Sequence, residues 1–441
     1  MNMMLKTRLW KQMLSVACLL CAVLGARAEA QVKNPATPVE RRAQDVSAQI
    51  RANPGEYEKY FSGSFLAQVP PERLTPIFVY YFTSLGRVVR VETKTLENPL
   101  SGRFSFIFEK NASVQVDIAV DAAEPHLITG LLLGNPVSLS GSLDTLAGEF
   151  KALPGESSLL VVRLAGDKLE PLVAHNAERP LAVGSAFKLY VLAELLRSVN
   201  KGERKWADVV ALRTEAVSLP SGILHRWPVG SALTLQTLAA LMISQSDNTA
   251  TDQLLLHLGR EQVERAQALA GHSKPELNMP FLSTLEMFRL KGEPGGVLAR
   301  KYLALSAQER RSFLTGALTQ VERSAIRFGG EPAHVDTIEW FASASDMCRA
   351  MNWLRLNSEA EPGRQAREIL AINPGLAVSK EKWKYVGYKG GSEAGVMNMT
   401  YLLQSSKGDW YALSAGWNNT KAPIDESKLA SLVGRAIELI P

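Results

Sequence analysis

The order of hydrophobic periods after residue 155 constrains the fold most strongly. Strand-like runs at 159–164 and 169–173 lie on either side of Gly166-Asp167, a pair typical of hairpin turns. Helical periods follow, and alternation returns only at 386–389, 396–404 and 410–417. A sheet whose strands come from both ends of a region must enclose the helical middle. We therefore expect one α+β domain over residues 155–441, with an antiparallel sheet and an all-helical lobe.

The helices of this region are expected wherever apolar residues recur at helical spacing. They fall at residues 185–198, 234–244, 249–258, 284–290, 307–315, 343–354 and 425–440.

The preceding region, residues 38–150, has its own pattern. Helical spacing at 40–52, 57–67 and 71–84 gives way after Gly86 to alternation of apolar and polar residues. Helices followed by a short antiparallel sheet form an α+β domain. It resembles the cystatin-like or NTF2-like fold, and we expect it to bind or scaffold rather than catalyse. The turn-rich stretch 148–158 marks the expected boundary between the two domains.

The first 28 residues have the pattern of a secretory signal. Four basic residues and no acid accompany an apolar run at 13–24, and the small-residue site Ala26-Arg27-Ala28 follows. The run is too short to remain as a membrane span. We therefore expect a periplasmic or secreted protein with no stable membrane insertion. Without these four charges the net charge of +5 falls to +1, which gives no electrostatic argument for a nucleic-acid partner.

Ser185 and Lys188 form the first candidate catalytic motif. Residues three apart share a helix face, so the lysine amine can reach the serine hydroxyl. A buried lysine of lowered pKa can remove the serine proton, and a helix start directs N–H groups at a developing oxyanion. The spacing alone is a weak signal.

Ser246-Asp247-Asn248 is the second motif, and it lies between two helical segments. A serine hydroxyl can relay a proton to a departing amine, and a carboxamide can hold both a substrate and a lysine. Taken alone, the triplet also fits an ordinary helix N-cap.

Lys389-Gly390-Gly391 is the third motif, and Ser392 follows it. Glycine lets a ligand approach a strand closely, and lysine supplies a charge for an anionic substrate. Taken alone, the triplet also fits an ordinary turn.

The three motifs occur together in one order, and in this combination residues 155–441 resemble the class A β-lactamases and penicillin-binding proteins. The two-domain layout also resembles a group of exported β-lactamase-like proteins with an NTF2-like N-terminal domain, one of them from a clavulanic acid biosynthesis cluster. The resemblance implies a β-lactamase/transpeptidase-like fold and a serine hydrolase that forms an acyl-enzyme.

The resemblance also implies a role for each matching residue. Ser185 is acylated, Lys188 is its base and Ser246 shuttles a proton. The implied substrate-binding residues are Asn248, Asn278, Lys389, Gly391 and Ser392, and the backbone N–H groups of Ser185 and Ser392 form the oxyanion hole. The implied partner is a small acyl substrate, with no cofactor and no metal.

Two positions depart from the family pattern. Lys274 lies where class A β-lactamases carry the glutamate that activates the deacylating water, and a charged ammonium cannot accept a proton. Glu276 is displaced by two residues. Gly390 replaces a threonine or serine whose hydroxyl binds the substrate carboxylate, and Ser392 is one possible substitute. We therefore expect acylation to be retained and deacylation of β-lactams to be slow.

Three other functions compete with this interpretation. A penicillin-binding peptidase of cell-wall peptides shares the three motifs and needs no deacylating glutamate. A non-catalytic binding module is the second alternative. A metallohydrolase is disfavoured because the six histidines are scattered.

Overall fold

The structure is a computed structural model that describes residues 36–138, 141–376 and 378–441. The expected signal at residues 1–28 lies outside these ranges and stays a prediction. The described residues bury their apolar side chains in one cluster before Leu133 and in further clusters after residue 142. The two regions of the sequence therefore have separate hydrophobic cores.

The first region is a curved antiparallel sheet covered by helices. Its strand order is β1-β2-β3-β4, and β5 pairs with β3. In β3, every second residue from Ala112 to Val120 is buried, as the alternation predicts. Its elements are α2 (Pro38–Gln49), α3 (Gly63–Gln68), α4 (Pro71–Leu85), β1 (Val88–Asn98), β2 (Ser101–Phe108), β3 (Ala112–Val120), β4 (Ile128–Leu133) and β5 (Val137–Ser138).

The second region is built on an antiparallel sheet with strand order β12-β13-β14-β6-β7. Two strands come from the start of the region and three from its end, as the order of strand-like and helical segments in the sequence predicts. Because β12 is at the edge, one side of its backbone stays open. The strands are β6 (Glu156–Ala165), β7 (Lys168–His175), β12 (Trp383–Glu393), β13 (Val396–Ser405) and β14 (Trp410–Asn418).

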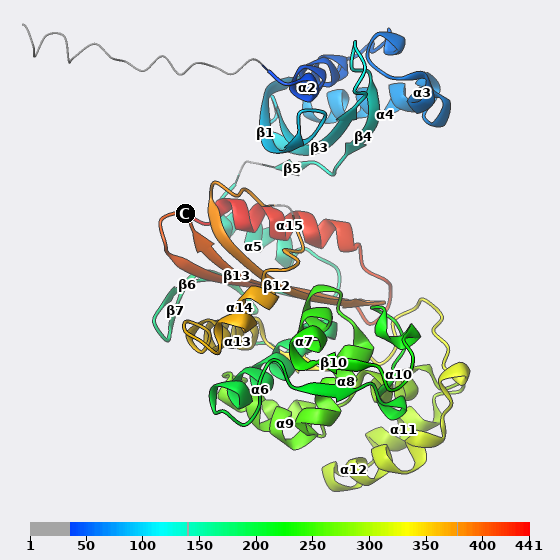
Figure 1. Ribbon diagram of the computed structural model, residues 1–441, viewed down its shortest axis with the longest axis vertical. Coiled ribbons are helices and arrows are strands. Elements are labelled where there is room, and N and C mark those ends of the chain that lie inside the picture. The colour runs from blue at the N-terminus through cyan, green and yellow to red at the C-terminus, as the bar shows by residue number, and fades with distance from the viewer. Residues whose placement is uncertain (1–35, 139–140, 377) are drawn as a thin grey trace, which may run out of the picture.

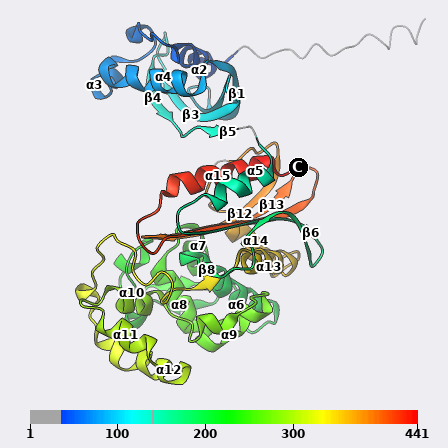
Figure 2. The same ribbon diagram turned by 180° about the vertical axis from the view of Figure 1, so that it is seen from behind.

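Helices cover both faces of this sheet (Figures 1 and 2). On one face lie α5 (Leu143–Lys151) and α15 (Glu426–Leu439). On the other face, α13 (Ala344–Leu356) packs on the sheet and on α6 (Lys188–Asn200). The expected α+β fold with a helical lobe is confirmed.

The helical lobe lies beyond α6. Its helices are α7 (Leu235–Ser244), α8 (Asn248–Leu258), α9 (Arg260–Leu269), α10 (Thr284–Gly292), α11 (Val297–Leu303) and α12 (Ala307–Thr315). One more helix, α14 (Arg364–Leu370), lies between α7 and the edge strand of the sheet. Short strands complete the region: β8 (Leu181–Ala182) pairs with β11 (Phe341–Ala342), and β9 (Val209–Ala211) pairs with β10 (Ala232–Thr234).

Helix α5 overlaps the turn-rich stretch 148–158, in which the sequence predicts the boundary between the two domains. The helix runs to Lys151 and buries Leu146 and Phe150 against the second sheet, and the domain boundary itself stays a prediction. The turn residues before Ser158 end this helix and start β6. The chain therefore passes from the apolar core of the first region to that of the second before Ser142, the N-cap of α5.

Lys389-Gly390-Gly391 lies inside a strand, whereas the sequence predicted a strand end at residue 389. Gly390 pairs with Met399 and Gly391 with Asn398, so β12 continues to Glu393. Pairing with β13 overrides the low strand propensity of glycine.

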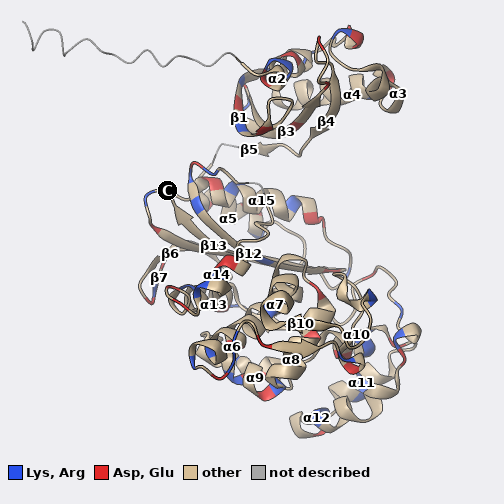
Figure 3. Cartoon of the chain, in the orientation of Figure 1, with Lys and Arg blue, Asp and Glu red and all other residues tan. Residues whose placement is uncertain are grey.

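Charges of both signs are interspersed over both regions (Figure 3). Within the described residues, no helix is both long and apolar enough to cross a membrane.

Candidate active site

A short 3-10 helix, η2 (Gly184–Phe187), holds Ser185 directly before α6. The backbone N–H of Val183 donates to Trp340 O at 3.0 Å, and the Phe187 ring stacks on Trp340 with 3.7 Å between centroids. These contacts fix the turn on both sides of the serine. Ser185 itself is partly exposed.

Lys188 is fully buried one turn further along the chain. Its Nζ donates to Asn248 Oδ1 at 2.7 Å and to Ser246, reaching the carbonyl O at 2.6 Å and Oγ at 3.1 Å. Burial, and then the neighbouring Lys389 charge, lower the pKa of this amine well below its usual value. A neutral lysine amine can accept a proton.

Asp247 fixes the second motif at the start of α8. Its carboxylate accepts hydrogen bonds from the backbone N–H groups of Ala250, Ile223 and Leu224 at 2.8, 2.6 and 2.9 Å. The triplet therefore includes the N-cap of α8, Asp247, and its role in a site stays a prediction. Ser246 has a φ of 54°, which turns its hydroxyl and carbonyl toward Lys188.

Lys389 reaches the same point from the sheet. Its Nζ donates to Ser246 Oγ at 3.1 Å. Burial lowers the pKa of Lys389 to about 7. Two lysine amines from different elements thus converge on one serine hydroxyl.

Gly391 brings the edge of β12 against Ser185. A β-carbon at Gly391 would lie 2.2 Å from Ser185 N, a distance that excludes any side chain there. A β-carbon at Gly184 would lie 3.2 Å from Ser392 N, so the Ser392 backbone also borders η2. The structure therefore brings together seven of the predicted site residues: Ser185, Lys188, Ser246, Asn248, Lys389, Gly391 and Ser392.

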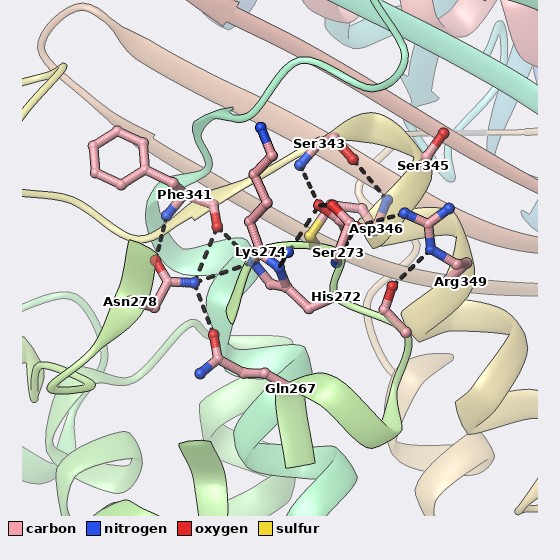
Figure 4. Close-up of polar contacts among 12 residues, drawn as sticks. Gln267, His272, Ser273, Lys274, Asn278, Phe341, Ser343, Ser345, Asp346 and Arg349 are labelled. Atoms are coloured by element: carbon pink, nitrogen blue, oxygen red, sulfur yellow. Dashed lines mark hydrogen bonds and ion pairs between the residues drawn. The ribbon is translucent and has the colours of Figure 1, made fainter. Parts of the chain in front are cut away.

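Asn278 has a different environment (Figure 4). Its Nδ2 donates to Gln267 Oε1 at 2.7 Å and to Phe341 O at 3.0 Å, and its Oδ1 accepts from Phe341 N at 2.8 Å. The side chain is buried, and its amide is already bonded on both sides. Since Phe341 belongs to β11, which pairs with β8 just before Ser185, we propose that Asn278 positions that turn instead of contacting substrate.

Lys274 and Glu276 are both exposed, and their loop is held from within by His272 and Asp346 (Figure 4). The His272 Nδ1 accepts from Lys274 N at 3.1 Å, and the Asp346 carboxylate accepts from Ser273 N at 2.8 Å. These contacts involve the backbone of the loop, and Lys274 is exposed.

A buried cluster that the sequence motifs do not include lies at the end of β12. Lys291 donates to Glu339 at 2.7 Å and also to Glu393, which follows Ser392. The cluster ties α10 and the segment before β11 to the strand beside Ser185. Alternation along β12, which places Glu393 on the face of Lys389 and Gly391, was the available signal.

A model of the beta-lactamase enzyme family matches residues 141–372, more than half of the chain. The chain belongs to the beta-lactamase enzyme family. As a member, it is a serine hydrolase that acts through an acyl-enzyme. The match spans Ser185, Lys188 and Ser246-Asp247-Asn248 and ends before Lys389. A search of curated proteins returned no match.

Solved structures also resemble this member of the beta-lactamase family. A beta-lactamase of Sphaerobacter thermophilus is 22% identical and covers 68% of this chain and 98% of its own, at a TM-score of 0.46. A beta-lactamase of Francisella tularensis is 13% identical and covers 67% of this chain and 98% of its own, at a TM-score of 0.46. The protein PBP-A is 14% identical and covers 67% of this chain and 96% of its own, at a TM-score of 0.44. Membership in the family rests on the family model.

Proposed function

We propose that this protein acylates itself on Ser185 with β-lactam, ester or amide substrates and releases the acyl group slowly. The observation that carries the proposal is the shared contact at Ser246 Oγ, which accepts hydrogen bonds from both Lys188 and Lys389. A hydroxyl between two amines of lowered pKa is suited to proton relay.

In the proposed acylation, the neutral Lys188 amine takes the Ser185 proton as Oγ attacks the substrate carbonyl. Asn248 Oδ1 holds the amine in place. Ser246 then passes a proton to the departing nitrogen or oxygen, and the acyl group stays on Ser185. The protonated Lys188 amine then returns its proton to the Ser246 hydroxyl, which leaves Lys188 neutral for the next step.

The N–H groups of Ser185 and Ser392 are the proposed oxyanion hole. The contact between Gly391 and Ser185 supports it, because it brings the open edge of β12 within reach of the carbonyl that Ser185 attacks. Lys389 would then attract the carboxylate of the substrate.

Slow deacylation is proposed because the position of the expected general base is occupied by Lys274. An exposed ammonium cannot deprotonate the water that attacks the acyl-enzyme. The same observation favours a second candidate, a penicillin-binding peptidase/transpeptidase of cell-wall D-Ala-D-Ala peptides, because in its transpeptidase reaction a peptide amine replaces water as the acyl acceptor. We further propose that the protein is exported to the periplasm or secreted.

The first prediction concerns Ser185. The wild-type protein should form a covalent adduct with a fluorescent penicillin, and the adduct should persist for minutes, because acylation is retained while water activation is impaired. Ser185→Ala should remain unlabelled. Gel fluorescence and intact-mass spectrometry measure both results.

Ser379→Ala is the matched control, because Ser379 and Lys382 repeat the spacing of the first motif at a different place: Lys382 donates to Glu438 O. Labelling of Ser185→Ala, or turnover of many penicillins per second by the wild type, would contradict the proposal.

A further inference from the structure

Three charged side chains from separate elements meet where β12 ends. Lys291, in the last turn of α10, donates from Nζ to Glu339 Oε1 at 2.7 Å and also to the carboxylate of Glu393. The side chains of Lys291 and Glu339 are only 1% and 0% exposed. None of the steps proposed for acylation uses this buried cluster.

Glu393 connects the cluster to the strand beside the serine. It directly follows Ser392, whose N–H belongs to the proposed oxyanion hole, and a β-carbon at Gly184 would lie 3.2 Å from Ser392 N. Pairing with β13 ends at Glu393 and Val396 and holds β12 along one side only. The bond from Lys291 therefore fixes the end of this edge strand from a third element.

Glu339 connects the same cluster to the turn that carries the serine. Its Oε2 accepts from Trp340 N at 3.1 Å while its Oε1 accepts from Lys291. Trp340 O in turn accepts from Val183 N at 3.0 Å, and the Trp340 ring stacks on Phe187 with 3.7 Å between centroids. The carboxylate of Glu339 thus fixes the residue that supports η2 on both sides of the serine.

The charges of the cluster balance at neutral pH. Burial and then the neighbouring Glu339 charge raise the pKa of Glu393 to about 9, so its carboxyl group stays protonated. Burial opposes the charge on Lys291, but the two carboxyl groups raise the pKa of its amine overall. One ammonium therefore faces one carboxylate, and the cluster places no net negative charge where it would repel a developing oxyanion.

Stability is a weak reason for such a cluster. Removing charged groups from water costs free energy that their mutual attraction returns only in part, and apolar residues of similar volume are often as stabilising. Hydrogen bonds to charged groups do impose a defined geometry. Here that geometry links the two segments that carry Ser185 and Ser392.

We propose that Lys291 is a positioning residue: its two hydrogen bonds hold the N–H groups of Ser185 and Ser392 at the separation that lets both donate to one oxygen. The proposal rests on the proposed function, since it assumes that these two N–H groups form the oxyanion hole.

The test replaces the carbonyl oxygen of a substrate by sulfur. It compares the rates at which p-nitrophenyl acetate and its thionoester acylate Ser185, after subtraction of the rate measured with Ser185→Ala. Lys291→Met keeps the length of the side chain and removes its charge. It should slow acylation by the oxygen ester about 100-fold, the loss expected for one misplaced oxyanion donor. The thionoester should lose less than about tenfold, because sulfur is a weak acceptor that gains little from the donors even in the wild type.

Arg260→Met is the matched control. Arg260 bonds Glu286 at 2.7 Å at the other end of α10, so the variant breaks an ion pair of the same helix without touching β12 or Trp340. It should leave the ratio of the two rates unchanged. Lys291→Met/Glu339→Gln removes the link without leaving an unpaired carboxylate at position 339, and it should show the same fall in the ratio even if Lys291→Met does not fold. Thermal unfolding verifies that each variant is folded.

Equal losses for both esters would overturn the proposal in favour of a general loss of structure. A wild type that releases no p-nitrophenol through Ser185 would count against the proposed function, and amide hydrogen exchange then decides the role of Lys291 by itself. Residues 183–187 and 390–394 should both exchange faster in the Lys291 variants than in the wild type and Arg260→Met. Unchanged exchange in either segment would refute the link.

Discussion

At the scale of single residues, two buried lysines lie at the centre of the candidate site. Lys188 and Lys389 are both enclosed, and both bond to Ser246 Oγ. Burial lowers the pKa of both amines, but their proposed roles need opposite charge states. Lys188 has to be neutral to act as a base, whereas Lys389 has to be charged to attract an anion.

This opposition predicts a pH dependence. Lys389 is charged below its pKa of about 7 and loses its proton as the pH rises through that value. The acylation rate for benzylpenicillin should therefore fall above pH 7 relative to that for its methyl ester, which does not need the charge. Stopped-flow acylation rates across pH 5 to 9, with the ester as the internal reference, measure this ratio. A ratio that does not change with pH would contradict a charge-bearing role for Lys389.

At the scale of elements, the site depends on how closely the edge strand β12 approaches the short helix η2. Gly391 permits this approach, since a β-carbon there would meet Ser185 N at 2.2 Å and Val183 O at 2.3 Å. Both obstacles are backbone atoms, which cannot rotate away as a flexible side chain can.

Gly391→Ala should therefore push β12 away from Ser185 and lower the acylation rate about 100-fold or more, because displacements of about 1 Å have such effects on catalysis. The control is Gly148→Ala in α5, where a β-carbon meets nothing within 4 Å. It should keep full acylation and add about 0.5–1 kcal/mol to the free energy of unfolding. Penicillin labelling and denaturant unfolding of both variants separate the two effects. Normal acylation by Gly391→Ala would show that the two elements do not need this contact.

At the scale of the whole molecule, the two regions bury separate cores. Val114, Val116 and Ile118 of β3 belong to the first core, while the sheet from β12 to β7 and its helices form the others. We propose two domains on this basis, with α5 assigned to the second.

A fragment of residues 141–441 should therefore fold alone and be labelled by penicillin on Ser185. The full chain should show a thermal transition that matches the fragment and a second one from the first region. Differential scanning calorimetry of both proteins measures this. A fragment without a cooperative transition would show that the second region needs the first in order to fold.

The sequence itself determined the elements and the chemical groups. In the second region, strand-like segments precede and follow the helical ones, and this order predicted a sheet built from both ends of the region. The prediction was possible because the spacing of apolar residues is a local property of the chain. The three motifs identified Ser185, Lys188, Ser246 and Lys389, because their chemistry depends on residue type and on short spacings. From the position of Lys274 the sequence also predicts that the usual base is absent, and this stays a prediction.

Tertiary structure decided what no local pattern contains. The helical propensity of residues 143–151 does not reveal that α5 packs on the second sheet, and strand propensity alone would end β12 at the glycines that pairing with β13 carries through. Asn278 is a free carboxamide in the sequence but a buried and fully bonded one in the fold. In each case the deciding contact joins residues of different elements.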